Sequence, residues 1–566
     1  MPVLVASSYF FILILPSVRA QVSSVNISAC STLAQANTTY VLTQDVTSTG
    51  TCFAIGAHGI TLDLNGKTVT YGTGSATRMY GIAVPSSSIT RRVWFPDLAI
   101  PDSAFIGADN ITIRNGTITQ SGTGTESYAI YLWGSDNTTI HNTTSTVQGD
   151  DTGNIYFNYS GHSTVYSNTM NNNSTVVTNR HQGRDVLGWE GGSGYLDVHD
   201  NTITGGPQYG IRVRQGDATG PAAIYRNTVN HHGRVANPYA IGISIDNASV
   251  YENTINPVNG RGIHLAGVNN ADVHDNTITV REGANPEYSP GWAQGIKIEN
   301  SRNSKVHSNA IIALAGNGYG HAYAIDITHD TTTYPISNTE VYSNTLTAIT
   351  PTASLWATPL HLIGVNAGSG YDIHDNTFIT NSFNVFADYD SATDVLFRSN
   401  TFRRAGTPIN AYTLYFYTGT RSSTNLQFYD SNFLDGTSMQ NVSYRAAGAT
   451  IGYLFGRTAS IRVQRSDGTP VAGASIATVN DQNTAGPNGI TGSDGTTNVR
   501  FPTRAYNGKP PVEVVHAPYS VTVTAPGYAT TTLPFNVEQS GQLTVTLQQS
   551  TADTIAPSTI LNLQAN

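Results

Sequence analysis

The chain has 566 residues, of which only 11% are Asp, Glu, Lys or Arg, against about 25% in an average soluble protein. Its formal net charge of −9 is modest, and no run of Lys and Arg would follow a phosphate backbone, which argues against nucleic acid as a partner. Gly, Thr, Asn, Ser and Tyr replace the missing charges, a mixture that favours short strands and tight turns over helices.

Residues 1–20 are typical of a secretory signal peptide. An apolar core runs from Tyr9 to Leu15, and a small-residue cleavage site ends at Ala20. This core is shorter than the about 18 apolar residues that a membrane span needs, and no later segment reaches that length. The sequence therefore predicts an exported protein, extracellular or periplasmic, without a membrane span.

The two cysteines, Cys30 and Cys52, follow soon after the predicted cleavage site. In an exported protein a disulfide between them is the favoured state, and it would staple the first turn of the fold. Two separate buried thiols are the alternative.

One six-residue phrase recurs along most of the chain. It consists of an aliphatic residue, Tyr or His, a polar residue, Asn, Thr and an apolar residue, as in Val198-His-Asp-Asn-Thr-Ile203 and Val250-Tyr-Glu-Asn-Thr-Ile255. The asparagines of successive copies are 23 to 35 residues apart. Weaker copies centre on Asn115, Asn142, Asn309, Asn400 and Asn432.

Two or three short strands in each repeat, with no helical periodicity between them, are typical of a coil of a parallel β-solenoid. A stack of identical asparagines suits this architecture, because Asn tolerates left-handed turns and its amide can bond to the coils above and below. The Tyr or His of the phrase recurs on nearly every coil. Such regularity favours a packing ladder over catalysis, so we exclude these histidines from the site.

Between consecutive copies of the phrase lies a strand such as Gly295-Ile-Lys-Ile-Glu299, in which apolar and polar residues alternate. This period of two is typical of a strand with one buried face. Related strands start at Gly210, Gly242, Gly262 and Ala324. Their apolar positions barely change, whereas their polar positions change every time, so we expect function on the outward surface.

Alignment of these five strands predicts two outward columns of side chains. The first column would hold Arg212, Ser244, His264, Lys297 and Asp326. The second would hold Arg214, Asp246, Ala266, Glu299 and Thr328.

These repeats resemble the right-handed parallel β-helix proteins of the pectate-lyase-like superfamily. The segment from Tyr40 to Gly66 is similar to the first coil of those proteins, and the resemblance covers about residues 25–455. It implies an all-β chain with a right-handed parallel β-helix over residues 21–456. The repeat encodes the solenoid only and says little about chemistry.

From about Arg457 the chain changes to short strands joined by Asp-Gly and Pro-Gly turns, the pattern of a small β-sandwich. Residues 457–550 resemble the carboxypeptidase-regulatory-like or transthyretin-like modules of secreted enzymes, which implies an accessory role. Residues 551–566 resemble a linker that enters a fibronectin type III domain and then stops, which would fit a fragment of a longer chain.

Paired carboxylates carry the leading functional hypothesis. Spacings of about 4.8 Å between coils and about 6.6 Å between alternate residues of a strand separate Glu299 from Asp326 by about 8 Å, and Asp246 from Glu299 by about 9–10 Å. Inverting glycosidases hold their acid and base about 6.5–9.5 Å apart. We therefore expect Glu299 and Asp326 to be the acid/base pair of an inverting glycoside hydrolase, with Asp246 as the replacement candidate.

Lys297 supports a competing hypothesis, a polysaccharide lyase, because β-elimination needs a base to take the proton alpha to a uronate carboxylate. His264, Arg212 and Arg214 would balance charge or bind substrate. The strand faintly resembles the Lys-bearing strand of alginate-lyase-type β-helices, although Asp326 stands where that family has an Arg. Neighbouring carboxylates would stabilise Lys297 as a cation, which makes it a poor base but suits it to holding an acidic sugar.

Aromatic residues lie shortly before the outward columns, where their rings would stack against the apolar faces of sugars. The candidates are Tyr209, Tyr239, Trp292 and Tyr323. The alternative is that they cover the ends of the solenoid core.

The sequence thus predicts a secreted, monomeric enzyme that cleaves a polysaccharide, with uronate-containing polymers among its substrates. A non-catalytic glycan-binding or adhesive solenoid is the third interpretation. This chemistry requires no cofactor. Oxygen ligands would suit Ca²⁺ at Asp150, Asp151 and Asn154, or at Asp246 with Glu299, and no Cys/His spacing indicates zinc.

Overall fold

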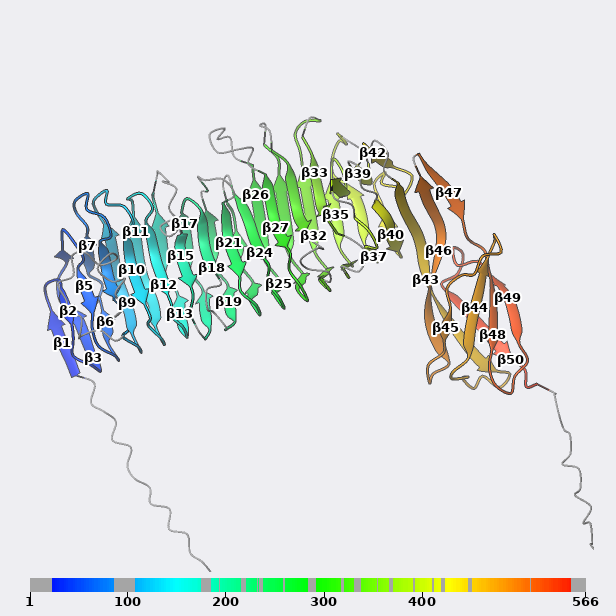
Figure 1. Cartoon of the computed structure of the whole chain (residues 1–566), viewed down its shortest axis with the longest axis horizontal. Helices are drawn as coiled ribbons and strands as arrows, with labels where there is room; N and C mark the ends of the chain where they lie inside the picture. The colour runs from blue at the N-terminus through cyan, green and yellow to red at the C-terminus, as the bar shows by residue number, and fades with distance from the viewer. Residues whose placement is uncertain are drawn as a thin grey trace, which may run out of the picture.

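The computed structural model describes residues 23–85, 107–174, 185–192, 194–214, 220–231, 233, 238–257, 260–282, 292–316, 320–329, 337–353, 355–365, 370–389, 392–409, 412–418, 423–445, 450–508 and 510–550. Its regular secondary structure consists of β-strands, β1 to β50. The strands build a long, curved stack of coils with a smaller unit at its C-terminal end (Figure 1). The predicted fold class, an all-β parallel β-helix followed by a small β-sandwich, is confirmed.

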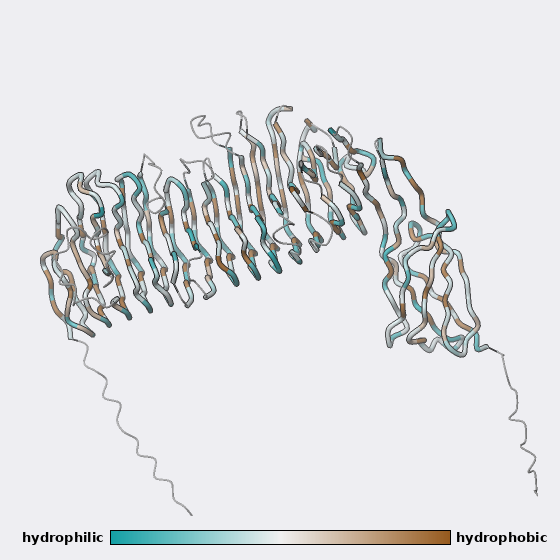
Figure 2. Tube along the Cα trace, viewed as in Figure 1, coloured by the Kyte–Doolittle hydropathy of each residue, from teal (hydrophilic) through white to brown (hydrophobic). Residues whose placement is uncertain are grey.

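Two sheets form the walls of the solenoid. One has 15 parallel strands. The other has 31 strands, takes two successive strands from most coils, such as β13 (Ser163–Tyr166) and β14 (Thr169–Asn172), and continues into the C-terminal unit with antiparallel pairing. Along the strands, apolar and polar residues alternate (Figure 2). On the 15-stranded sheet, for example, Ile263 and Leu265 point into the core and are fully buried. That sheet consists of β2 (Ser31–Leu33), β5 (Phe53–Ile55), β8 (Tyr80–Val84), β10 (Tyr128–Trp133), β12 (Gly153–Asn158), β15 (Asp185–Glu190), β18 (Tyr209–Arg214), β21 (Tyr239–Ser244), β24 (Arg261–Ala266), β27 (Ala293–Glu299), β30 (Ala322–Thr328), β33 (Ala357–Ile363), β36 (Val385–Tyr389), β39 (Leu414–Thr418) and β42 (Val442–Tyr444).

The recurring asparagine forms the predicted ladder. Asn201 donates from Nδ2 to the carbonyl of Val165 on the preceding coil (2.8 Å) and to Oδ1 of Asn227 on the next (3.0 Å). An amide supplies a donor and an acceptor in one buried side chain, which a carboxylate cannot do. The buried ladder runs through Asn168, Asn201, Asn227, Asn253, Asn276, Asn309, Asn344, Asn376 and Asn400.

Two details of the asparagine prediction are wrong. The left-handed residue is the one before the ladder asparagine, for example Asp200 (φ 55°), which leaves the Asn free to turn inward. The weak copies at Asn115, Asn142 and Asn432 are displaced by one residue, because Gly116, Thr143 and Ser431 occupy the ladder position there. A partial copy of the phrase does not define register to a single residue.

The Tyr and His residues of the phrase stack on the outside of the 31-stranded sheet, with ring centroids 4.6 to 5.1 Å apart, which confirms the packing ladder. The ladder runs from His141 to His374. Its strands are β11 (Thr139–Val147), β13 (Ser163–Tyr166), β16 (Leu196–His199), β19 (Ala222–Tyr225), β22 (Ser249–Tyr251), β25 (Asp272–His274), β28 (Lys305–His307), β31 (Glu340–Tyr342) and β34 (Asp372–His374).

At the N-terminal end, Cys30 and Cys52 form the predicted disulfide, with an S–S distance of 2.08 Å. The bond joins the residue before β2 to the residue before β5, on the next coil.

At the C-terminal end, one long strand links the two units. The first part of β43 (Ile451–Arg465) pairs with β40 (Ser423–Tyr429), and its last part pairs with β50 (Gln542–Leu547). Phe455 packs in the solenoid core, whereas Ala459 and Ile461 pack in a second core. The other strands of the C-terminal unit are β44 (Ser475–Asn480), β45 (Gly489–Ile490), β46 (Thr496–Gly508), β47 (Pro511–Val515), β48 (Tyr519–Thr524) and β49 (Thr531–Phe535).

Candidate functional site

Three columns of outward side chains cross the 15-stranded sheet, because equivalent residues of successive coils pair in register. The first column holds Asp185, Tyr209, Tyr239, Arg261, Gln294 and Tyr323. The middle column holds Gly188, Arg212, Gly242, His264, Lys297, Asp326, His361 and Phe386. The last column holds Glu190, Arg214, Ser244, Ala266, Glu299, Thr328, Ile363 and Asp388.

The predicted register is wrong at Asp246. Gly242, and not Ser244, pairs with Arg212 and His264, so this strand is displaced by two residues from the sequence alignment. A displacement of two keeps every apolar residue on the inner face, and the period-two pattern therefore cannot detect it. Asp246 lies beyond the end of β21, outside the column of Glu299, where its Oδ1 accepts the backbone N–H of Asn269 (2.8 Å).

Three predicted residues meet at one carboxylate oxygen. Oε2 of Glu299 lies 2.9 Å from Nε2 of His264 and 2.7 Å from Nζ of Lys297. The Glu299 side chain is 36% exposed, whereas His264 and Lys297 are largely covered. The ring of His264 stacks on Tyr239 at 4.4 Å between centroids, which holds the imidazole in place. We call these three residues the central cluster.

Burial and the charges that the three residues exert on one another determine the protonation states of the central cluster. The hydrogen bond from His264, together with Lys297, lowers the pKa of Glu299 to about 2 against the effect of burial. Burial, together with the charges of Lys297 and Arg261, lowers the pKa of His264 although Glu299 acts to raise it. Burial also lowers the pKa of Lys297, but Tyr239, Glu299 and Asp326 outweigh it, and the pKa lies above its usual value. At neutral pH the cluster therefore holds a carboxylate, a neutral imidazole and an ammonium.

The hydrogen bond to Glu299 also indicates the tautomer of His264. An ionised carboxylate can only accept, so Nε2 of His264 carries the ring proton. Nδ1 is then the basic nitrogen of the ring.

Asp326 lies one coil from Lys297, as predicted, but it is only 1% exposed. Its Oδ1 lies 2.9 Å from Nδ1 of His361, and its Oδ2 accepts from Gln294. Nε2 of His361 lies 3.3 Å from Asp388. Burial lowers the pKa of His361, but the two carboxylates outweigh it and raise that pKa to about 9. Asp326 is thus one side of a buried Asp–His–Asp bridge.

The predicted aromatic residues differ in accessibility. Tyr239 and Tyr323 are buried and stack against His264 and His361, so they support these rings, as the core-covering alternative expected. Tyr209 and Trp292 are partly exposed. The guanidinium carbon (Cζ) of Arg212 lies over the ring of Tyr209, 5.0 Å from the ring centroid. Trp292 packs edge-on against Tyr323.

Sequence reasoning missed Arg261 at the centre of the sheet. Its Nη1 donates to the hydroxyl of Tyr239 (2.9 Å), and its guanidinium lies over the rings of Tyr239 and Trp292. Arg261 occupies the first column, directly before Gly262. The neighbouring coils place Tyr209 and Tyr239 at this position, so the column could have identified it.

A second group was also missed, at the ends of β15. Burial raises the pKa of Asp185 to about 6, although Nη1 of Arg212 lies 3.5 Å away. Glu190 accepts from the hydroxyl of Tyr156 (2.6 Å) and pairs with Arg214 (3.4 Å). The strand lacks the Gly-Ile pattern of its neighbours, so no repeat marks it in the sequence.

One of the proposed calcium ligands, Asn154, already has hydrogen-bond partners within the protein. Asn154 is fully buried, and its amide donates to Ser145 and Asn171. Among the described residues, no cluster of three or more His, Cys, Asp or Glu side chains is placed to hold a metal ion. Within the same ranges, no helix has the length and hydrophobicity of a membrane span.

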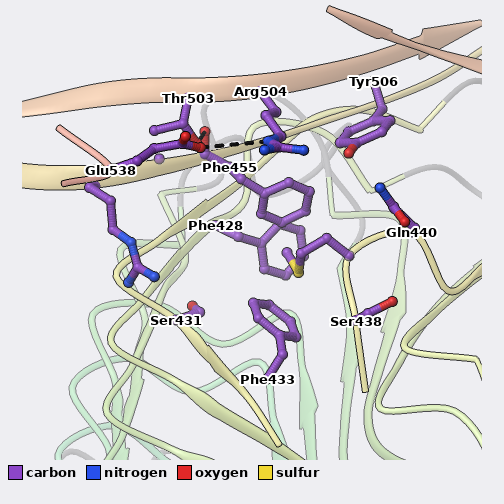
Figure 3. Close-up of a pocket in the computed structure, with 13 residues that line it drawn as sticks. Phe428, Ser431, Phe433, Ser438, Gln440, Phe455, Thr503, Arg504, Tyr506 and Glu538 are labelled. Carbon is purple, nitrogen blue, oxygen red and sulfur yellow. Dashed lines mark hydrogen bonds and ion pairs between the residues drawn. The ribbon is translucent and has the colours of Figure 1, made fainter. Parts of the chain in front are cut away.

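A separate cavity of about 360 Å³ lies where the solenoid meets the C-terminal unit (Figure 3). Arg504 at its edge forms ion pairs with Glu513 (3.1 Å) and Glu538 (3.6 Å). The cavity lies on later coils than the central cluster and is lined by Phe428, Ser431, Phe433, Ser438, Met439, Gln440, Phe455, Gly456, Arg457, Thr503, Arg504, Tyr506 and Glu538.

The comparison with protein families agrees with the fold. The family model described as a right handed beta helix region matches residues 185–402, the stretch that holds the three columns. The solved tailspike protein of E. coli bacteriophage HK620, in complex with a pentasaccharide, is 12% identical, with 87% of this chain and 86% of that chain covered and a TM-score of 0.34. A mutant of that tailspike gives the same identity and coverage with a TM-score of 0.37. No curated protein matches the chain.

Proposed function

We propose that the protein binds an acidic, uronate-containing polysaccharide along the outward face of the 15-stranded sheet and cleaves it by β-elimination at the central cluster. One observation carries the proposal. A neutral imidazole, His264, is held between an ionised carboxylate and an aromatic ring, next to the protonated Lys297.

Each member of the cluster has a role in this reaction. Nδ1 of His264 takes the proton from the carbon alpha to the uronate carboxylate, and the electrons of that C–H bond form a carbon–carbon double bond as the glycosidic C–O bond breaks. The imidazolium then returns its proton to the leaving oxygen. Glu299 orients the ring and stabilises its charged form, as a carboxylate does for a catalytic histidine. The ammonium of Lys297 stabilises the charge that develops on the uronate carboxylate.

The surrounding charges support an acidic substrate. Four cations, Arg212, Arg214, Arg261 and Lys297, occupy the three columns between β18 and β27. All four are at least partly exposed, in a chain with few charged residues. Arg212, Arg214 and Lys297 also pair with the carboxylates of Asp185, Glu190 and Glu299, and all four cations offer donors for charge-assisted hydrogen bonds with uronate groups.

Lys297 is less suited to be the base, because its pKa is raised and it stays protonated. Hydrolysis at the central cluster is also less well supported. An inverting hydrolase needs one carboxyl group that holds a proton. Glu299, with a pKa of about 2, is ionised, and Asp326 is covered and bound to the His361 imidazolium.

Hydrolysis at β15 is the second candidate. It is favoured by the pKa of Asp185, about 6, which allows this carboxyl to hold a proton near neutral pH as a general acid does. Asp185 is 1% exposed, as covered as Asp326, so substrate would reach it only after a side-chain rearrangement. Glu190 at the other end of the same strand would then be the base.

A product assay tests the proposal. The purified protein is incubated with uronate-containing and neutral polysaccharides, and unsaturated ends are measured by ultraviolet absorbance together with reducing ends. We expect both to rise together on a uronate polymer, and to persist in Asp185→Asn. Reducing ends without unsaturated ends, lost in Asp185→Asn, would establish the hydrolase instead. Binding without either product would establish a glycan-binding solenoid.

A further inference from the structure

Among the described residues of the solenoid, one turn places aromatic residues in the left-handed conformation, whereas the other left-handed residues are Gly, Asn, Asp, Ser, Arg or Glu. The turn from β12 to β13 contains two residues in the left-handed conformation that are neither Gly nor Asn, Tyr159 (φ 51°) and His162 (φ 48°). A bulky residue in this conformation costs about 1–3 kcal/mol, and such outliers cluster at functional sites. The neighbouring coils show what these corners ordinarily hold.

At the corner of Tyr159, the preceding coil has Gly134 and the following coil has Gly191, both with positive φ. Gly267 and Asn300 occupy the same corner further along. The corner of His162 belongs to a column that is mostly asparagine. It contains Asn110, Asn137, Asn247, Asn270, Asn303 and Asn338, together with Pro221, Gly370 and Asp394. Tyr195 is the next residue after His162 in that column.

The replacements expose aromatic rings. Tyr159 is 53% and Tyr195 is 47% exposed, more than the other large hydrophobic side chains of the described solenoid. Tyr159 lies 6.2 Å from Trp133, and His162 meets Tyr195 edge-on at 5.2 Å, between ring centroids. We call Trp133, Tyr159, His162 and Tyr195 the corner patch.

Two glycines make room for the corner patch. A Cβ at Gly191 would lie 3.0 Å from the Tyr159 ring, and a Cβ at Gly194 would lie 2.5 Å from the His162 ring. Both rings therefore rest directly on the backbone of the next coil. A side chain at either glycine would collide with these rings, so Gly191 and Gly194 are needed for Tyr159 and His162 to take these positions.

We infer that the corner patch is a stacking subsite for a sugar ring of the same acidic polysaccharide, an inference that rests on the proposed function. Trp133 stands in the last column, in line with Glu190, Arg214 and Glu299, so the patch continues the charged face. Flat rings with polar tips suit the apolar face of a pyranose. Four side chains are too few for a stable protein interface, which buries about 1,200–2,000 Å².

The position of the patch predicts which substrates need it. Tyr159 lies five coils from Glu299, a distance of about 24 Å along the solenoid axis. A polymer spans both sites, whereas a short oligosaccharide at the central cluster does not reach the patch. The subsite therefore contributes to polymer affinity and leaves the cleavage of short substrates unchanged.

The solenoid supplies the test variants. Tyr159→Gly with His162→Asn installs the residues of the neighbouring corners, and Tyr195→Asn removes a ring without altering a left-handed residue. We expect KM for the polymer to rise about tenfold, with kcat/KM on the shortest cleaved oligosaccharide unchanged. The thermal midpoint should stay the same or rise, because strain is relieved. Asn338→Gly, at the equivalent corner of a distant coil, is the matched control.

Three outcomes separate this inference from the proposed function. A selective loss of polymer affinity in the patch variants supports the subsite. An unchanged polymer KM, in a protein that does cleave the polymer, overturns the subsite and leaves the proposed function standing. An unmodified protein that neither binds nor cleaves any glycan overturns both.

Discussion

The two walls of the solenoid use their outward side chains in opposite ways. On the 31-stranded sheet, Tyr and His rings stack in one unbroken column from His141 to His374, and each coil repeats the last. On the 15-stranded sheet, the middle column changes from Arg212 to Gly242, His264 and Lys297 over four consecutive coils. The same fold supports both walls.

The difference teaches how to distinguish structural from functional side chains in a repeat protein. A contact that every coil makes with its neighbours supports the stack, and its residue recurs. A side chain that acts on a ligand is needed once, so it interrupts the column. His264 and His274 illustrate this, because they lie on consecutive strands, one bonded to Glu299 and the other stacked between Tyr251 and His307.

The largest expected effect is a loss of activity from a change on the 15-stranded sheet, whose outward residues vary from coil to coil. Lys297→Met removes the ammonium that stabilises developing charge, and we expect kcat/KM on the uronate polymer to fall by about 10²–10³-fold. Lys305→Met, on β28 of the 31-stranded sheet, is the matched control and should leave the rate unchanged. Equal rates for the two variants would remove Lys297 from the mechanism.

The next effect is on stability and belongs to the buried ladder. Asn276→Ala deletes bonds to the carbonyls of Val250 and His274 and to the amide of Asn309. Because these buried partners are left unsatisfied, we expect the free energy of unfolding in urea to drop by about 2–4 kcal/mol. Activity per folded molecule should persist. A drop below about 1 kcal/mol would contradict the ladder's role.

The buried Asp–His–Asp bridge predicts a pH dependence of stability. Asp326 and Asp388 outweigh burial and raise the pKa of His361 to about 9 from an ordinary 6.5. The stability from the imidazolium is therefore complete below pH 6.5 and is lost as the pH rises through 9, by about 1–3 kcal/mol. Thermal unfolding from pH 6 to 10 measures this loss. The decline should be shallower in His361→Gln, and an identical slope would argue against the bridge.

The smallest effect should come from the exposed ring ladder. Tyr251 stacks between Tyr225 (4.8 Å) and His274 (5.0 Å), and Tyr251→Leu removes both ring contacts. We expect a loss of about 1 kcal/mol in the free energy of unfolding. The kcat/KM should not change, and a large loss of activity would mean that the 31-stranded sheet also acts on substrate.

Most of the fold could be predicted from the sequence, because its signals are local and repeated. The period of two predicts which face of each strand is buried, and the Asn phrase marks one position in each coil. Both signals fail where they are ambiguous. A slip of two residues at Gly242 leaves the apolar pattern intact and displaces Asp246 from the column of Glu299.

The candidate site was only partly predictable. His264, Lys297 and Glu299 belong to Gly-Ile strands in the correct register, so the sequence brings them together. The state of Asp326 depends on His361 and Asp388, which lie on later coils that lack this pattern. Burial by side chains distant in sequence, and the pKa values that follow from it, carry no local sequence signal.

The most direct test of the account compares the two histidines on opposite walls. His264→Gln and His274→Gln change the same residue type on consecutive strands, and kcat/KM on the uronate polymer is measured for both. The account predicts a loss of at least about 100-fold for His264→Gln and a change within about twofold for His274→Gln. Equal effects of the two substitutions, or a larger loss for His274→Gln, would contradict it.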